Sequence, residues 1–210
     1  MGIIEDVYSA VIDGKVDDAA AGVQQGLDSG IAVDDILKKG LLAAMDLVGE
    51  RFGANEIFIP QVIWSAKAMQ AGMDILRPHF TEGQQAKSAR IVIGTAEGDI
   101  HDIGKNLVGM MLEGAGFEVV DLGVGVKPEQ FVEKAVEEKA DIIGVSALLT
   151  TTMKGMAEVV TLKNEKGLSS LKVIIGGAPL SQDFCTEIGA DAYGVDAMDA
   201  VAKVKELMGL

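Results

Sequence analysis

The sequence RIVIGT at residues 90–95 leads through a short turn into GDIHDIGKN at residues 98–106. The first segment is a run of mostly apolar residues, which is typical of a buried strand in a parallel sheet. The second segment passes into a helix-like stretch from Ile103 to Glu113. A strand, a glycine-bearing turn and a helix in this order predict the first unit of an open α/β sheet. Ligands bind in such sheets outside the carboxyl ends of the strands.

The alternation of strand and helix continues to the end of the chain. Apolar segments of strand length are expected at residues 90–95, 118–122, 141–146, 172–176 and 192–195. Helices are expected at residues 103–113, 128–139, 152–166, 181–188 and 197–208. This pattern predicts a flavodoxin-like (Rossmann-type), five-stranded parallel sheet over residues 89–210, with the strand order 2-1-3-4-5. In that order the turns after strands one and three, residues 96–102 and 147–151, converge.

The first 80 residues have a helical period instead. Two apolar stripes with spacings of three and four predict two long helices, and their members are Leu37, Leu41, Met45, Val48 and Phe52, then Val62, Ala66, Met69, Met73 and Leu76. Two shorter helices are expected before them, at Ile3–Ile12 and Val16–Leu27. Short connections between four helices predict an antiparallel bundle over residues 1–80. The polar segment 81–88 predicts a linker between this bundle and the α/β half.

Composition restricts the class of protein. The 210 residues carry a net charge of −14, which argues against nucleic acid or an anionic membrane as a partner. The single cysteine, Cys185, fits a reducing compartment, and its helical setting predicts a buried structural thiol. With no signal-peptide pattern and no apolar run long enough to span a bilayer, we expect a cytoplasmic protein.

Three weak motifs fall at the predicted carboxyl ends of strands. His101 has a carboxylate on each side, at Asp99 and Asp102, which suits a metal ligand held by an acid, although a lone D-x-H is more often a solvated loop. A hydroxyl-rich run follows at residues 146–152, and its threonines also suit a helix N-cap. The pair Gly176-Gly177 suits an ordinary turn. Together the three motifs outline one slot in which side chains do not obstruct a ligand.

Other functions that share this topology need residues that this sequence lacks. The ends of strands three and five, at Ser146 and Asp196, do not supply the aspartate and lysine of a phospho-accepting receiver domain. Two acids in the first loop, Glu97 and Asp99, would repel the phosphate of FMN. Neither a G-x-G-x-x-G fingerprint after strand one nor a Walker A sequence is present.

The three motifs in order resemble the signature of B12-binding (corrinoid-binding) domains. That signature is Asp99-x-His101-x-x-Gly104, then Ser146-x-Leu148, then Gly176-Gly177. In the helical half, residues 56–62 with Ala66-x-x-Met69 resemble the cap module of cobalamin-dependent methionine synthase. The whole chain resembles the small corrinoid proteins that serve methanol, methylamine and methoxyaromatic methyltransferases.

The resemblance implies a role for each matching residue. His101 would replace the cofactor's own benzimidazole as the lower ligand of cobalt, and Asp99 would hold its other ring nitrogen. Thr152 would be the third member of a catalytic relay, the hydrogen-bonded series that begins with His101 and Asp99, and Thr151 is the near alternative. Phe58 would cover the upper face of the corrin, although ordinary bundle core is an equal interpretation. The remaining cofactor-binding residues implied are Ile100, Asp102, Ile103, Gly104, Ser146, Leu148, Thr150, Thr151, Gly176, Gly177, Tyr193 and Gly194.

The resemblance also implies a function. A base-off, His-on cobalamin (methylcobalamin once loaded) would carry a methyl group from a donor-specific methyltransferase to an acceptor methyltransferase that uses tetrahydrofolate or a thiol. A reductive activase is a further expected partner, and the chain would be a carrier component rather than a complete enzyme. Two alternatives are the small subunit of an adenosylcobalamin-dependent mutase and a corrinoid-sensing regulator.

Overall fold

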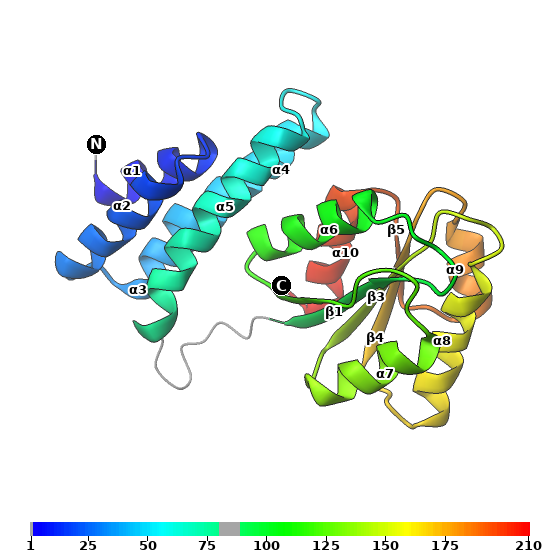
Figure 1. Cartoon of the computed structure of the whole chain (residues 1–210). Coiled ribbons are helices and arrows are strands. Elements are labelled where there is room, and N and C mark those ends of the chain that lie inside the picture. Colours follow the sequence, from blue (N-terminus) through cyan, green and yellow to red (C-terminus); the bar gives the residue numbers. More distant parts are fainter. Residues whose placement is uncertain (1, 80–88) are drawn as a thin grey trace. The chain divides into compact units, whose positions relative to one another are not determined.

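The computed structural model of the chain describes residues 2–79 and 89–210 (Figure 1). The chain divides into two compact units, the second of which begins at Ala89. The linker predicted at residues 81–88 lies outside the described residues. Among the helices that are described, none is both long and apolar enough to cross a membrane.

The first unit is helical. Its elements are α1 (Ile3–Ile12), α2 (Val16–Asp28), α3 (Val33–Asp35), η1 (Ile36–Leu42), α4 (Ala43–Gly53), α5 (Ile59–Leu76) and the short 3₁₀ turn η2 (Arg77–His79). The bounds of α1 are those predicted, and α2 runs one residue further. The third predicted helix is one continuous stretch, α3–η1–α4, whose middle is a π-helix with i→i+5 hydrogen bonds.

The two predicted stripes form much of the core of this unit. Leu37, Leu41, Met45 and Val48 are buried, while Phe52 at the end of the first stripe is only half-buried. Pro60 lies in the first turn of α5, where its missing N–H breaks no helical hydrogen bond. The backbone N–H of Phe58, at the N-cap of α5, donates to Gln61 Oε1 at 2.8 Å and fixes the start of the helix.

The second unit is a parallel sheet covered by helices. Its elements are β1 (Arg90–Thr95), α6 (Ile103–Gly114), β2 (Glu118–Asp121), α7 (Pro128–Glu137), β3 (Ile142–Ser146), α8 (Lys154–Glu165), β4 (Lys172–Gly176), α9 (Gln182–Ile188), β5 (Ala192–Gly194) and α10 (Ala197–Met208). The strand order β2-β1-β3-β4-β5, all parallel, confirms the predicted topology.

Helices cover both faces of the sheet. α6 and α10 lie on one face, and α7, α8 and α9 lie on the other (Figure 1). A core cluster joins the second group of helices to the strands, and it includes Phe131, Met156 and Val160 together with Ile143 and Ile175. Such burial on both faces explains why the strands are apolar at nearly every position.

Sheet register aligns the ends of four strands. Thr95 pairs with Ser146, Ser146 with Gly176, and Gly176 with Gly194. Ser146, Gly176 and Gly194, three of the residues predicted to bind a ligand, therefore lie in one row at the carboxyl edge of the sheet. One predicted boundary was wrong there, because α8 begins at Lys154 rather than at Thr152. Residues 149–152 form a turn instead, closed by the Thr152 N–H donating to the Leu149 carbonyl at 3.1 Å.

Candidate functional site

Asp99 is the centre of the carboxyl-edge site. Its side chain is 0% exposed, and each oxygen accepts hydrogen bonds from a different direction. Oδ1 accepts from the backbone N–H of His101 at 3.0 Å and from the His101 ring Nδ1 at 2.7 Å. Oδ2 accepts from the N–H of Leu148 at 2.7 Å and from the N–H of Leu149 at 3.2 Å. The turns after β1 and β3 are therefore joined through one carboxylate.

Asp99 is ionised despite its burial. Burial alone would raise the pKa of this carboxyl, but the hydrogen bonds donated by His101, Leu148 and Thr152 lower the pKa far below its ordinary value. Because an ionised carboxylate only accepts, His101 Nδ1 carries the proton of this hydrogen bond. This fixes the tautomer of the ring and leaves Nε2 as the nitrogen that is available to a metal.

His101 is presented outward from this buried anchor. Its side chain is 48% exposed, whereas the carboxylate that holds it is inaccessible. The loop around it is fixed at a second point, where the Thr95 hydroxyl donates to the His101 carbonyl at 3.1 Å. A single outward-facing imidazole would suit a metal whose other ligands come from a macrocycle, so this donor fits a corrinoid, which would be held by His101.

Thr152, and not Thr151, reaches the carboxylate. The Thr152 Oγ1 lies 3.0 Å from Asp99 Oδ2 and 2.8 Å from the Leu149 carbonyl oxygen, so its single hydrogen serves two acceptors. Thr152 is buried and Thr151 is exposed. Neither caps α8, whose N-cap is Met153, so the interpretation of these threonines as caps was wrong. Thr150 is exposed in the same turn.

Large apolar side chains are exposed at the same edge. The edge apolar set follows strands β1, β2, β3 and β5 and consists of Ile100, Ile103, Val124, Leu148, Leu149 and Val195. Exposed apolar residues gathered at one edge of a sheet mark a surface that another group covers. The motif predicted Ile100, Ile103 and Leu148. It missed Val124, Leu149 and Val195, which a search for apolar residues directly after strand ends would have found.

The glycines at this edge are of two kinds, which differ in what an added side chain would contact. Gly104 and Gly125 face open space, because a Cβ added at either position would meet no heavy atom of the described residues within 4 Å. Gly177 is different, because a Cβ there would lie 1.8 Å from the Ala147 carbonyl oxygen, and its φ is +141°. The backbones after β3 and β4 therefore approach closely at Gly177. This close packing of the two backbones requires glycine at residue 177, which the sequence analysis did not predict.

The other predicted residues lie along the same edge or in its first turn. Asp102 and Ser146 are half-buried, and Gly176 and Gly194 pair at the ends of β4 and β5. Tyr193 donates its hydroxyl to the Leu180 carbonyl at 3.1 Å, which ties β5 to the turn before α9. Cys185 is buried as expected, and burial raises the pKa of its thiol, which disfavours the thiolate.

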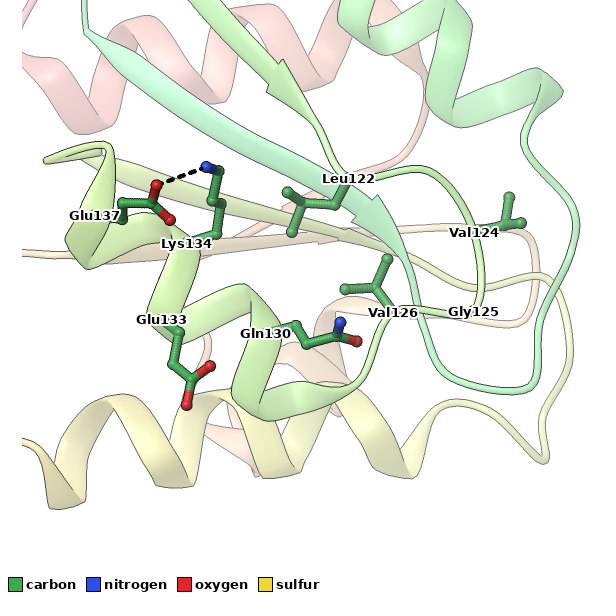
Figure 2. Close-up of a pocket in the computed structure, with 8 residues that line it drawn as sticks. All are labelled: Leu122, Val124, Gly125, Val126, Gln130, Glu133, Lys134 and Glu137. Carbon is green, nitrogen blue, oxygen red and sulfur yellow. Dashed lines mark ion pairs between the residues drawn. The ribbon is translucent and has the colours of Figure 1, made fainter.

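Two cavities border this edge. One of about 430 Å³ lies between the turn after β2 and helix α7, and Figure 2 shows Val124 and Gly125 at one end and the Lys134–Glu137 ion pair at the other. None of the predicted site residues lines it. A smaller cavity of about 230 Å³ includes Thr152 together with Glu97, Lys154 and Glu158.

In the helical unit, Phe58 is 66% exposed. The interpretation of Phe58 as bundle core was therefore wrong. Ile59 beside it is also exposed, so the start of α5 presents an apolar surface.

The fold and the histidine site together define the class of the protein. Residues 89–202 match a family model described as a B12 binding domain, and residues 3–77 match a second model of the same description. The chain belongs to this B12-binding family, and a corrinoid is its cofactor.

Similar proteins match over nearly the whole chain. Dimethylamine corrinoid protein 3 of Methanosarcina acetivorans is 44% identical, over 99% of this chain and 97% of that protein. A crystal structure of a methanol:cobalamin methyltransferase complex from Methanosarcina barkeri matches with a TM-score of 0.86 and 32% identity, over 99% of this chain and 80% of that one. A cobalamin-binding protein from Desulfitobacterium hafniense matches with a TM-score of 0.78 and 35% identity, over 98% of both chains.

Proposed function

We propose that the chain carries a methyl group on the cobalt of a corrinoid held base-off, with His101 as the lower ligand. The observation that carries this proposal is the arrangement at the carboxyl edge: a half-exposed imidazole anchored by a buried, ionised aspartate. The bound corrinoid supplies the methyl-accepting and methyl-donating chemistry, and the protein positions and tunes it.

The edge apolar set supports a flat, largely apolar ligand over the histidine. Ile100 and Ile103 stand on either side of His101 in the sequence, and both are at least three-quarters exposed. Leu148 and Leu149 come from the turn whose N–H groups bind Asp99. Covering these side chains with a macrocycle removes apolar surface from water while the imidazole coordinates the metal. We assign the nucleotide tail to the row Ser146, Gly176, Gly177, Tyr193 and Gly194.

The Asp99–Thr152 pair would adjust the charge of the ligand. The carboxylate holds the Nδ1 proton of His101, which makes the ring a better donor at Nε2. Thr152 gives the carboxylate a second partner whose one hydrogen can turn to the Leu149 carbonyl instead. With a metal bound at Nε2, the imidazole would donate more or less electron density as the charge on the metal changes, while the Asp99 carboxylate stays buried.

The relatives support a methyltransferase as a partner. The similar structure from Methanosarcina barkeri is a complex with a methanol:cobalamin methyltransferase. We propose a donor methyltransferase as the first partner here, and an acceptor methyltransferase and a reductive activase as further partners. The helical unit would serve as the cap, with the exposed Phe58 covering the methyl-bearing face.

The proposal is tested with protein loaded with corrinoid and reduced to Co(I). Each of several methyltransferases is added with its methylated substrate, and the Co(I) absorption band is followed. We expect the band to decay with one methyltransferase and its substrate together, and to persist when either is omitted. Methyl iodide serves as a partner-independent control. Decay with methyl iodide but with no methyltransferase from the amine, methanol and methoxyaromatic classes would contradict the carrier function.

A further inference from the structure

Lys105 is a buried cation that the proposed function does not use. It lies in the first turn of α6, four residues after His101, and its side chain is 2% exposed. Its ammonium group forms an ion pair with Asp121 Oδ2 and donates to Asn106 Oδ1 at 2.7 Å. Removing an ammonium group from water is costly, so the buried charge of Lys105 depends on these two polar partners.

Asp121 connects this lysine to a turn. Asp121 is the last residue of β2, and its second oxygen, Oδ1, accepts the N–H of Gly123 at 2.9 Å. The turn at residues 122–126 then passes beside the carboxyl end of β1 (Figure 2). The Lys105–Asp121 pair therefore holds the start of α6 against the beginning of this turn.

The same turn supports the histidine loop from its other side. The Gly125 N–H donates to the backbone carbonyl of Asp99 at 3.0 Å, and the Val126 N–H donates to the carbonyl of Thr95 at 2.9 Å. Thr95 in turn donates its hydroxyl to the His101 carbonyl. The loop that carries His101 is thus bounded by α6 on one side and by the turn on the other, and the ion pair joins the two.

We propose that Lys105 and Asp121 are positioning residues that fix the His101 imidazole for axial coordination of cobalt. This inference rests on the proposed function, because it concerns the same histidine. The ion pair and the Asp121–Gly123 hydrogen bond would hold the start of α6 and the turn in one relative position. His101 stands two residues before the start of α6, so a shift of the helix start is passed directly to the ring.

The chain contains a matched control for this pair. Lys163 is 7% exposed and pairs with Asp191 at 3.2 Å, so it is also a buried lysine bound to an aspartate in the α/β unit. Asp191 directly precedes β5 and binds the N–H of Val173 in β4, so this pair lies at the amino edge of the sheet. The two pairs are alike in type and stand at opposite edges.

The test compares Lys105→Met with Lys163→Met. Each protein is labelled with ¹⁵N in histidine only, loaded with unlabelled hydroxocobalamin and reduced to Co(II), and the EPR signal is resolved into fractions with and without the doublet of a ¹⁵N ligand. We expect both variants to lose thermal stability, but only Lys105→Met to lose the ¹⁵N doublet of histidine, with coordination weakened about tenfold, as for other residues that orient a metal ligand. Asp121→Asn provides a second variant, since Asp121 is 47% exposed and asparagine keeps an acceptor for Gly123.

The outcomes separate this inference from the function on which it rests. Wild-type protein whose Co(II) signal lacks the ¹⁵N doublet of histidine, or keeps that doublet in His101→Ala, contradicts the proposed function and this inference with it. Splitting that depends on His101 but is unchanged in Lys105→Met and Asp121→Asn leaves the function standing and overturns the positioning role. An equal loss of splitting in Lys163→Met would also overturn it, because the effect would then be general destabilisation.

Discussion

Each edge of the α/β sheet contains an aspartate that is withdrawn from solvent, Asp99 fully and Asp191 partly, and the two differ in their hydrogen-bond partners. At the amino edge, Asp191 binds the ammonium groups of Lys163 and Lys172 and the N–H of Val173. At the carboxyl edge, Asp99 binds an imidazole, backbone N–H groups and one hydroxyl. In both, burial raises the pKa of the carboxyl and the hydrogen bonds lower it further than burial raises it.

The difference distinguishes a structural carboxylate from one that orients a ligand. Lysine ammonium groups have donors only, so Asp191 and its partners form a closed set. An imidazole hydrogen-bonded through Nδ1 still has Nε2 as a second nitrogen. The negative charge of Asp99 therefore affects a group that binds at Nε2 of His101. Among the described strand ends, only those at the carboxyl edge, where Asp99 lies, have exposed large apolar side chains beside them. The comparison makes predictions that differ between the two edges.

The largest effect is expected at Gly177. An alanine there places Cβ 1.8 Å from the Ala147 carbonyl oxygen at a φ of +141°. We expect Gly177→Ala to lower the free energy of unfolding by at least about 3 kcal/mol, because neither backbone can move without disrupting a strand end. The measurement is chemical denaturation of the apoprotein.

Gly176→Ala is the control for this substitution. A Cβ at residue 176 meets the Gly194 carbonyl oxygen at 3.5 Å, which is an ordinary contact. We expect a change within about 1 kcal/mol. Equal stability of the two variants would show that the close approach of the strand ends is not a structural requirement.

At the amino edge, Asp191→Asn is expected to destabilise the protein without affecting the cofactor. The substitution leaves the buried ammonium group of Lys163 without its counter-charge. We expect a loss of about 2–3 kcal/mol in the free energy of unfolding, below the range for fully buried pairs because Asp191 retains some solvent contact. Lys203→Met, which removes an exposed pair with Glu206, should change stability by less than about 0.5 kcal/mol. A changed cobalt spectrum in Asp191→Asn would contradict the separation of the two edges.

At the carboxyl edge, Asp99→Asn is expected to act mainly on ligand binding. Asparagine has one acceptor oxygen in place of two, so the donors of His101 and Leu148 cannot both be satisfied. We expect coordination by His101 to weaken about 10–100-fold. With ¹⁵N in histidine only, the fraction of the Co(II) EPR signal that shows the ¹⁵N doublet measures this loss, and an unchanged fraction would rule out Asp99 as the group that orients the ring.

The smallest effect is on the dependence of stability on pH. The pKa of Asp191 is lowered in the folded protein from an ordinary value of 3.8, so the unfolded chain binds its proton more readily. Its contribution is therefore present above the unfolded pKa and is lost as the pH falls through the lower, folded pKa. Acid unfolding of Asp191→Asn should show a weaker dependence on pH below about pH 4 than wild type does. Parallel curves would contradict the assigned role.

Much of the fold could be predicted because its elements are set by local pattern. The apolar run 90–95 is bounded by polar residues and a glycine-bearing turn, and β1 has the predicted bounds. The π-helix at Ile36–Leu42 could not be predicted, since apolar spacings of three and four suit either kind of helix. Its hydrogen-bond pattern depends on packing within the bundle.

The site residues that lie within one sequence motif could be predicted, whereas those positioned by contacts between distant parts of the chain could not. His101 and Asp99 stand two residues apart, and that spacing suffices for their hydrogen bond. The choice of Thr152 over Thr151 depends on the turn that precedes α8, which propensity does not define. Lys105 resembles any solvated helix lysine in the sequence, because Asp121 lies 16 residues away along the chain.

The most direct test of the central claim is an EPR spectrum of Co(II) protein in which only histidine carries ¹⁵N. His101 coordination predicts that the nitrogen splitting changes from the triplet of ¹⁴N to the doublet of ¹⁵N, because the detached benzimidazole of the unlabelled cofactor contributes no splitting. A triplet that persists, from a benzimidazole still bound to cobalt, would contradict the account, as would a spectrum with no nitrogen splitting.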